Sequence, residues 1–215
     1  MSEPENDLET SLADVVRRFP ALPIDPLRRY THEILRWNDE VGLVSKKQPV
    51  AACRRLLIES AEFGAVVAGA LATERAQAPR VADVGSGAGF PGIVWHLLFP
   101  AWDFLLIERR EKRAVFLEQM VRLLSLPRVC VFAGDARDAS RLDRHRGSFD
   151  VVATMAVGEP ARTAPQIEDL LVTNGIFATT LPEEAVAPER CGRHLFLESD
   201  VRAHFGRYGL YRNRV

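Results

Sequence analysis

The chain has 215 residues, of which 47% are hydrophobic and 27% are charged, a balance typical of one globular domain with at most a small appendage. Its formal net charge of −1 does not by itself indicate a nucleic-acid-binding protein. No apolar stretch approaches the roughly 20 residues of a membrane-spanning helix, so we expect no membrane partner. The acidic start, MSEPENDLET, lacks the basic and apolar regions of a signal peptide, and we expect residues 1–10 to form a flexible tail.

The three cysteines, Cys53, Cys130 and Cys191, lie far apart in the sequence. None has the CxxC spacing of a metal site, and their odd number argues against a disulfide framework. We therefore predict incidental or buried thiols, no metal and a cytoplasmic protein, because thiols stay reduced in that compartment.

Helical periodicity dominates the first third of the chain. Apolar residues recur at three- and four-residue intervals from Leu27 to Trp37, which is typical of an amphipathic helix. An Asp-Pro pair favours a helix start, and a glycine favours a helix end. The predicted helices are residues 11–19, a stretch from Asp25-Pro26 to just before Gly42, and residues 49–72. We predict that residues 11–75 form an N-terminal helical segment.

Strands and helices alternate after Pro79. The predicted strands are residues 80–84, 103–108, 128–134, 149–157 and 175–181, with helices at residues 93–98, 110–124 and 160–173. The strands are apolar throughout, which is typical of a parallel sheet covered by helices on both faces. The sequence therefore predicts an α/β domain over residues 76–215. Near its end, RHLFLE and LYRNRV each fit a strand, although one of them also fits a tail.

The segment VADVGSGAGFPG, residues 81–92, ends the first of these strands in a run of glycines. Such glycines fit either a tight strand-to-helix turn or a loop whose backbone a ligand approaches closely. The position at the carboxyl end of a parallel strand favours a ligand, because open α/β sheets bind ligands at that edge. The sequence contains no GxxxxGK[ST], which excludes a phosphate-binding P-loop.

Three carboxylates accompany this turn, and each has two interpretations. Glu108 ends the second strand about 20 residues beyond the glycines, where acids bind ribose hydroxyls, or it is a solvated strand end. Asp135 follows the third strand and, beside the amide of Ala136, can read an adenine edge or cap the following helix. Asp83, within the first strand, can orient a bound ammonium group or hold the amides of the turn.

Together these features favour S-adenosylmethionine over a nicotinamide dinucleotide. The GSGxG spacing fits both cofactors, but the acids, the Pro91-Gly92 ending and the lack of a separate substrate domain fit a small methyltransferase better. The predicted cofactor-binding residues are Asp83, Gly85, Ser86, Gly87, Gly89, Phe90, Glu108, Arg109, Asp135 and Ala136.

Two motifs occur together here that general methyltransferases rarely combine. DVGSGAGFPG is followed, after a strand and an acid, by Lys112-Arg113 and Phe116-Leu117. This arrangement resembles the bacterial small-subunit (16S) ribosomal RNA guanine-N7 methyltransferases, the RsmG or GidB family, which have D-V-G-[ST]-G-x-G-[FL]-P-G and K-R-x-x-F-L. Trp37 begins a similar W-N pair, and RLLIES at residues 55–60 resembles the family's R-H-x-x-D-S. The similarity covers roughly residues 25–180.

The resemblance implies a Rossmann-like class I methyltransferase fold preceded by a small helical part. It also implies S-adenosylmethionine as the cofactor and ribosomal RNA or the small ribosomal subunit as the partner. By position, the resemblance implies that Gly85, Gly87 and Phe90 line the cofactor pocket. It implies that Glu108 binds the ribose and that Asp135 and Ala136 contact the adenine. A methyltransferase of the same fold acting on a small molecule, and a non-catalytic binding protein, are the alternatives.

The chain departs from the family pattern at three places. The family's N-L-T, S-R-A and K-G are replaced by GLVS at residues 42–45, by ATMA at residues 153–156 and by LP at residues 181–182. Met155 therefore stands at the arginine position, and two positive charges expected beside the substrate are missing. Arg162 and Arg193 are the candidates to replace them.

The basic residues are mostly arginines: only three of the 28 are lysines. Arginine suits phosphate, although a GC-rich genome also favours arginine over lysine. Clustered cations could bind the RNA backbone without reading its sequence, or they could lie on a solvated helix face. Lys112 and Arg113 could instead pack their helix. The candidate RNA-binding residues are Arg17, Arg18, Arg28, Arg29, Lys46, Lys47, Arg54, Arg55, Lys112 and Arg113.

Guanine N7 carries an exposed lone pair, so no base needs to deprotonate it before attack. Methyl transfer can then depend on alignment of the reacting atoms in a dry pocket. We therefore assign no catalytic residue from the sequence.

Overall fold

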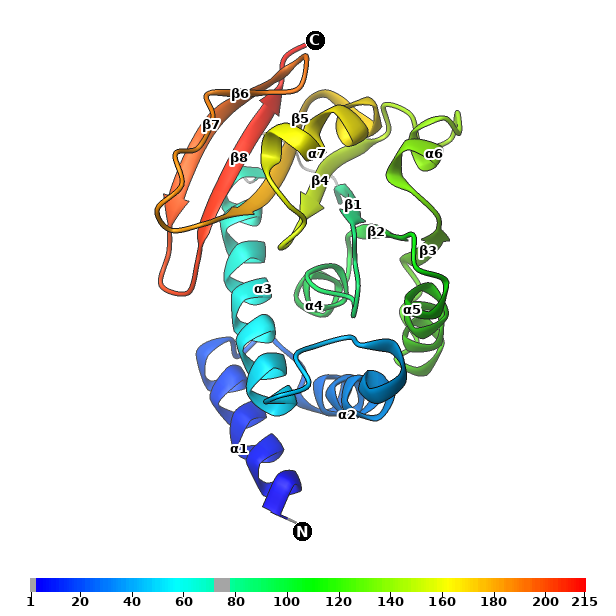
Figure 1. The fold of residues 1–215 in the computed structure, drawn as a ribbon, viewed down its shortest axis with the longest axis vertical. Helices are drawn as coiled ribbons and strands as arrows, with labels where there is room; N and C mark the ends of the chain where they lie inside the picture. Colours follow the sequence, from blue (N-terminus) through cyan, green and yellow to red (C-terminus); the bar gives the residue numbers. More distant parts are fainter. Residues whose placement is uncertain (1–2, 72–77) are drawn as a thin grey trace.

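The computed structural model describes residues 3–71 and 78–215. Within these ranges the strands form one sheet in the order β3-β2-β1-β4-β5-β8-β7-β6. In the described ranges, α1 (Glu3–Arg18), α2 (Ile24–Val41) and α3 (Pro49–Leu71) come before the sheet in the sequence and are drawn in blue to cyan in Figure 1.

Helix α1 begins at Glu3, so residues 3–10 are helical and do not form the flexible tail that the sequence predicted. The reason is an apolar spacing that continues upstream of residue 11. Leu8, Leu12 and Val15 follow one another at four- and three-residue intervals, and all three are buried. They belong to the same core as side chains of α2 and α3. Residues 1 and 2 lie outside the described part of the chain.

The strands of the first half of the sheet run parallel. They are β1 (Arg80–Val84), β2 (Asp103–Glu108), β3 (Val129–Ala133), β4 (Phe149–Thr154) and β5 (Leu171–Leu181), and the helices between them are α4 (Gly92–Leu98), α5 (Glu111–Leu123), α6 (Ala136–Ser140) and α7 (Pro160–Ile167). Their parallel pairing confirms the predicted α/β architecture. The chain runs outward from β1 to β3 and returns to β4 on the other side of β1. Ligands bind at such a reversal of strand order, outside the carboxyl ends of the strands.

Alternate residues of these strands face two separate cores. Leu106 of β2 faces the core that includes side chains of α1 to α5, where the rings of Phe63 and Trp95 pack edge to face at 5.0 Å. Leu105, the preceding residue, faces the core that includes side chains of α6 and α7. Helices therefore cover both faces, as predicted, and the N-terminal helices share a core with the sheet.

Antiparallel strands complete the sheet beyond β5. They are β6 (Arg190–Cys191), β7 (Leu195–Arg202) and β8 (Arg207–Asn213), and β8 pairs with β5. RHLFLE and LYRNRV therefore both contribute to strands, whereas β6 was not predicted. Strand β4 ends at Thr154, not at residue 157. Strand β5 starts at Leu171, not at residue 175, because Leu171 pairs with Phe149 of β4 and does not continue the preceding helix.

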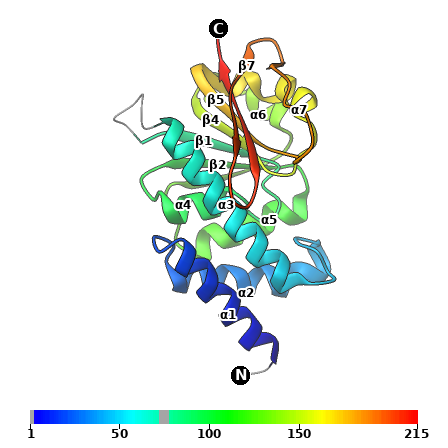
Figure 2. The same cartoon turned by 90° about the vertical axis from the view of Figure 1, so that its left-hand side faces the viewer.

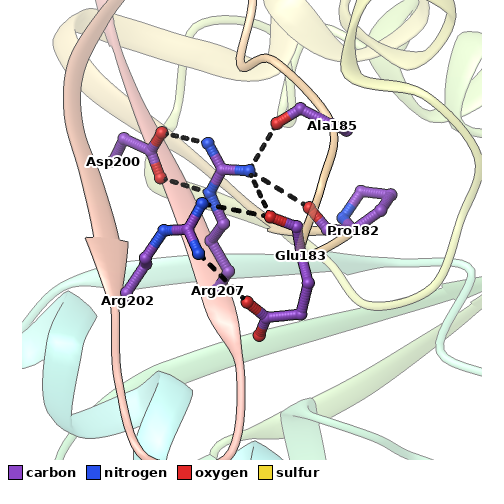
Figure 3. Close-up of polar contacts among 6 residues, drawn as sticks. All are labelled: Pro182, Glu183, Ala185, Asp200, Arg202 and Arg207. Carbon is purple, nitrogen blue, oxygen red and sulfur yellow. Dashed lines mark hydrogen bonds and ion pairs between the residues drawn. The ribbon is translucent and has the colours of Figure 1, made fainter.

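A buried arginine fastens the β7–β8 hairpin to the loop that follows β5 (Figure 3). Arg207 Nε donates to Asp200 Oδ1 at 2.8 Å across the hairpin. Arg207 Nη1 donates to the carbonyl oxygens of Pro182, Glu183 and Ala185. Because a guanidinium group offers five donors, this one side chain ties three carbonyls of the loop to the hairpin.

The same hairpin is tied to helix α3, beside which β8 lies (Figure 2). The Glu62 carboxylate accepts hydrogen bonds from His204 N at 2.9 Å and from the Tyr208 hydroxyl at 2.9 Å. The Tyr208 ring stacks on Phe63 with centroids 4.7 Å apart. The C-terminal strands are therefore packed on the N-terminal helices as well as on the sheet.

Replacement of Leu8 by alanine tests the early start of α1. Because Leu8 is 2% exposed, we expect Leu8→Ala to lower the free energy of unfolding by about 2–3 kcal/mol. The exposed neighbour Thr10→Ala serves as the control and should change it by less than about 0.5 kcal/mol. Chemical denaturation measures both, and equal stability of the two variants would contradict the packing of this turn.

Candidate active site

The turn between β1 and α4 presents bare backbone at the carboxyl edge of the sheet. Gly85 N and Ser86 N both donate to the carbonyl of Ile107 on β2, at 2.8 and 3.2 Å. Gly85, Gly87 and Gly89 all have positive φ, which favours glycine. At Gly87 (φ 57°) the nearest atoms to an added Cβ would be 3.7 Å away. This part of the turn is open enough for a ligand to approach the backbone.

Glu108 holds the turn and also faces the space above it. The residue is 5% exposed, and its carboxylate accepts hydrogen bonds from Gly87 N at 3.0 Å and from Arg110 N at 2.8 Å. An ionised carboxylate has about four acceptor sites, so two remain. Glu108 is therefore an ordered acceptor placed beside the open backbone, which the solvated-strand-end alternative does not describe.

Asp135 caps helix α6, which was one of its two interpretations. Its Oδ1 accepts from Arg137 N at 3.0 Å and from Arg137 Nε at 3.1 Å. The hydrogen bond from the Arg137 side chain, with that from its amide, lowers the pKa of Asp135 below its usual range. The carboxylate is therefore ionised at neutral pH and keeps a second oxygen free to accept from a ligand.

A cavity of about 630 Å³ opens over the carboxyl ends of β1 to β4, a size typical of small-molecule sites. The predicted cofactor residues that line it are Gly85, Ser86, Gly87, Phe90, Glu108, Arg109, Asp135 and Ala136. The structure thus brings eight of the ten predicted residues to one cavity.

Asp83 and Gly89 lie behind the turn, outside the cavity wall. A Cβ on Gly89 would meet Ile93 Cδ1 at 2.5 Å, so its glycine is required by packing. Asp83 is 1% exposed, and its Oδ2 accepts from Gly92 N at 3.0 Å. This geometry matches the interpretation of Asp83 as an acid that holds the turn. Burial raises its pKa to about 7 in spite of the hydrogen bond from Gly92.

The cavity lining also contains apolar side chains that the sequence did not predict as site residues. Leu43, Leu56 and Met155 are among them. Asn38 positions Leu43, because its side-chain oxygen accepts from the amides of Leu43 and Val44, both at 2.8 Å. Met155 follows β4, which pairs with β1. Because the carboxyl ends of neighbouring parallel strands lie at the same edge, the sequence could have predicted Met155 as a lining residue. The two leucines come from helical regions distant in sequence, and no local signal marks them.

A known protein family matches most of this chain. A sequence model of the GidB family, described as rRNA small subunit methyltransferase G, matches residues 24–185. The chain belongs to this family. The motif-based resemblance to RsmG/GidB proteins is thereby confirmed.

Several curated relatives carry the name ribosomal RNA small subunit methyltransferase G. The chain is 36% identical to that of Symbiobacterium thermophilum over 165 residues, covering 73% of this chain and 65% of the relative. It is 32% identical to that of Halorhodospira halophila over 173 residues, covering 80% and 76%. The matched region spans only 64% of the Desulfitobacterium hafniense relative and 58% of the Nitrosomonas europaea relative.

Solved structures with low sequence identity share the fold. The putative methyltransferase yhhF from Escherichia coli superposes with a TM-score of 0.56 at 17% identity, covering 72% of this chain and 87% of that one. The crystal structure of MtNAS in complex with MTA and tNA superposes with a TM-score of 0.59 at 16% identity, covering 89% and 71%. These similarities confirm the predicted Rossmann-like methyltransferase fold of this GidB family member.

Three of the candidate RNA-binding arginines share one carboxylate. Arg17, Arg18 and Arg54 all pair with Asp14. The hydrogen bond from Arg18 and then that from Arg54 hold the pKa of Asp14 well below its usual range. This part of the predicted basic surface is therefore an ion-pair network between α1 and α3, with one negative charge among three positive ones.

The other candidate cations divide into paired and unpaired groups. Arg28 pairs with Glu9 and Asp25, and Arg55 pairs with Glu59. Among the described residues, no ion pair involves Arg29, Lys46, Lys47, Lys112 or Arg113.

Arg113 lines the cavity and donates to the carbonyl of Gly42, so it joins α5 to the loop after α2. Of the two arginines considered as replacements for missing charges, Arg162 lines the cavity, whereas Arg193 pairs with Glu168 and Asp169 away from it.

Residues 3–71 and 78–215 contain no group of three or more His, Cys, Asp or Glu side chains that could bind a metal ion. In the same ranges, no helix has the length and apolar character needed to cross a membrane. The three cysteines are free; Cys53 and Cys191 are buried and Cys130 is exposed.

The buried carboxyl of Asp83 makes stability depend on pH. Because its pKa is raised in the folded state, its contribution is largest at low pH and is lost as the pH rises through about 7. Relative to Asp83→Asn, the wild-type free energy of unfolding should therefore fall by roughly 2 kcal/mol between about pH 5 and pH 8. Urea denaturation across this range measures the difference, and parallel curves for the two proteins would contradict the assignment.

Proposed function

We propose that this GidB family member is a cytoplasmic S-adenosylmethionine-dependent methyltransferase that acts on guanine N7 of small-subunit ribosomal RNA. The names of its relatives support the RNA substrate. Similar folds in complex with MTA and with AdoMet support the cofactor. The observation that carries the proposal is the open backbone at Gly87 beside the buried, half-satisfied carboxylate of Glu108.

The cavity residues fit the parts of this cofactor in strand order. At the end of β2, Glu108 has free acceptor sites for two ribose hydroxyls. At the end of β3, Asp135 and the amide of Ala136 offer an acceptor and a donor for the adenine edge. The bare turn at Gly85 and Gly87 leaves room for the methionine end. When bound, S-adenosylmethionine supplies a methyl group activated by the neighbouring sulfonium charge.

The lining of the cavity suits an acceptor that needs no deprotonation. Among the described residues that line it, the acids are Glu108 and Asp135, and histidine, lysine, cysteine and tyrosine do not occur. Both acids already accept hydrogen bonds from backbone amides, on the side of the turn away from β4. A ring nitrogen with a free lone pair, such as guanine N7, can react there by alignment alone.

Cations at the mouth of the cavity suit an RNA backbone. Arg109 and Arg110 are exposed and line the cavity, and the exposed Lys112 follows them in the first turn of α5. Lys47, on the loop that Arg113 ties to α5, is also exposed. Such side chains contact phosphates and position the RNA without reading its bases.

Labelled methyl transfer to small ribosomal subunits that lack the native mark tests the proposed activity. We expect the wild-type protein to transfer label from S-adenosylmethionine to a guanine of the subunit RNA. Subunits that already carry the mark serve as the control and should take up little label. Binding of the cofactor without any transfer to unmarked subunits would contradict the RNA assignment and favour another acceptor.

Replacement of Glu108 by glutamine tests the cofactor assignment. Glutamine offers one acceptor oxygen for two backbone amides and removes the charge, so we expect Glu108→Gln to weaken S-adenosylmethionine binding about 10- to 100-fold. Calorimetry measures the affinity. Asp103→Asn, at the opposite end of β2, is the matched control and should bind like the wild type. Equal affinity of all three proteins would place the ribose elsewhere.

A further inference from the structure

The cavity has two chemically different ends, set by the order of the strands. The carboxylates Glu108 and Asp135 follow β2 and β3, on one side of the glycine turn. Met155 follows β4, on the other side of it, and Arg162, Thr163 and Gln166 of α7, the helix after β4, also line the cavity without adding a carboxylate. Residues after β4 reach the turn itself, because a Cβ on Gly85 would meet Val157 Cγ2 at 2.8 Å. A ligand with its ribose at Glu108 therefore directs its other end toward Met155.

Three apolar side chains from three separate elements line the cavity. Leu43 and Met155 are each 8% exposed and belong to one core cluster, against which the half-buried Leu56 packs. Met155 Sδ accepts a hydrogen bond from Ser60 Oγ at 3.5 Å. Ser60 lies four residues after Leu56 on α3, and residues at this spacing share a helix face. Leu56 and Met155 therefore border the same part of the cavity.

We propose that Leu43, Leu56 and Met155 form an apolar slot that receives an unstacked, uncharged base of the RNA. The inference rests on the proposed function and specifies how its acceptor is held. The slot carries no carboxylate, and the neighbouring Arg113 guanidinium is engaged with the carbonyl of Gly42. The base is therefore held by packing and desolvation, with the charged contacts left to the phosphates at the mouth.

An unstacked base is the form of RNA that fits this slot. In an A-form helix the major groove is deep and narrow, so N7 of a stacked guanine is out of reach of side chains. Enzymes that modify bases extrude the target nucleotide and hold it between apolar or aromatic side chains. Arg110, which lines the cavity, and Lys112, two residues later, are exposed cations available to the backbone of such a nucleotide.

Methionine-methyl NMR tests the slot without relying on activity. The chain has three methionines, and Met120 is buried in α5, outside the cavity, as an internal reference. With S-adenosylhomocysteine bound, guanosine 5′-monophosphate at about 10 mM, enough to fill a millimolar site, should shift the Met155 methyl signal upfield and leave Met120 unmoved. Ribose 5-phosphate should shift neither signal. Met155→Leu assigns the resonance.

Variants of the slot and of the nearby cations distinguish binding of the base by apolar packing from binding of the phosphates by charge. We expect Leu56→Ala to weaken guanosine monophosphate binding, and to raise the KM for small subunits, about 10-fold. Its affinity for S-adenosylmethionine and the salt dependence of RNA binding should not change. Lys112→Ala should instead lower the slope of that salt dependence by about one. The exposed Val115→Ala on α5 is the control for all measurements.

Two results would overturn the slot. One is an unmoved Met155 signal in the presence of guanosine monophosphate, and the other is an equal shift with ribose 5-phosphate. Failure of the proposed function gives a different result, namely a base-specific shift of Met155 without methyl transfer to subunits. In that case the slot stands and the acceptor is another neutral ring.

Discussion

The ligand-binding edge of this protein depends on a glycine turn that the second strand holds from both its backbone and its side chain. The carbonyl of Ile107 accepts from the amides of Gly85 and Ser86, and the carboxylate of Glu108 accepts from Gly87 N. From behind, Asp83 accepts from Gly92 N. Hydrogen-bond acceptors on β1 and β2 therefore fix the backbone conformation of the turn. The turn needs no side chains of its own on its open face. The same carboxylate that holds Gly87 lines the cavity, so the geometry of the turn and the chemistry of the cavity are coupled.

Strand order converts this local arrangement into a cavity with distinct ends. Carboxylates follow β2 and β3, whereas Met155 follows β4, and helix α3 and the loop after α2 add further lining residues. The N-terminal segment therefore does more than cover one face of the sheet, since Leu56 of α3 and Leu43 of the loop after α2 line the cavity. The turn and its carboxylates lie within residues 24–185, the part of the chain that the GidB family model matches. The apolar end contains positions at which this chain departs from the family motifs.

Much of the fold followed from local patterns. Apolar strands alternating with helices predicted the parallel sheet, and acids at strand ends predicted Glu108 and Asp135, because the carboxyl ends of parallel strands meet at one edge. The errors arose where tertiary pairing decided the structure. Leu171 has a helical spacing from the residues before it but pairs with Phe149 of β4. Residues 3–10 are acidic and polar, yet a single buried leucine extends their helix.

The apolar residues of the cavity lining could not be predicted from local sequence patterns for a similar reason. Leu43 and Leu56 have the periodicity of ordinary core residues, and only the docking of α2 and α3 onto the sheet brings them to the glycine turn. Arg113 is a similar case. Its basic motif was consistent with RNA contact, but its guanidinium donates a hydrogen bond to the carbonyl of Gly42, on the loop after α2. Local sequence patterns therefore predict site residues that lie at the end of their own strand. They do not predict site residues that reach the cavity only because another element packs against the sheet.

The most direct test of this account is a crystal structure with S-adenosylhomocysteine bound. It should place the adenine beside Asp135 and Ala136, the ribose hydroxyls on Glu108, and the thioether sulfur toward Met155 and Leu56. A ligand bound in the reverse direction, or outside this cavity, would contradict the assignment of its two ends.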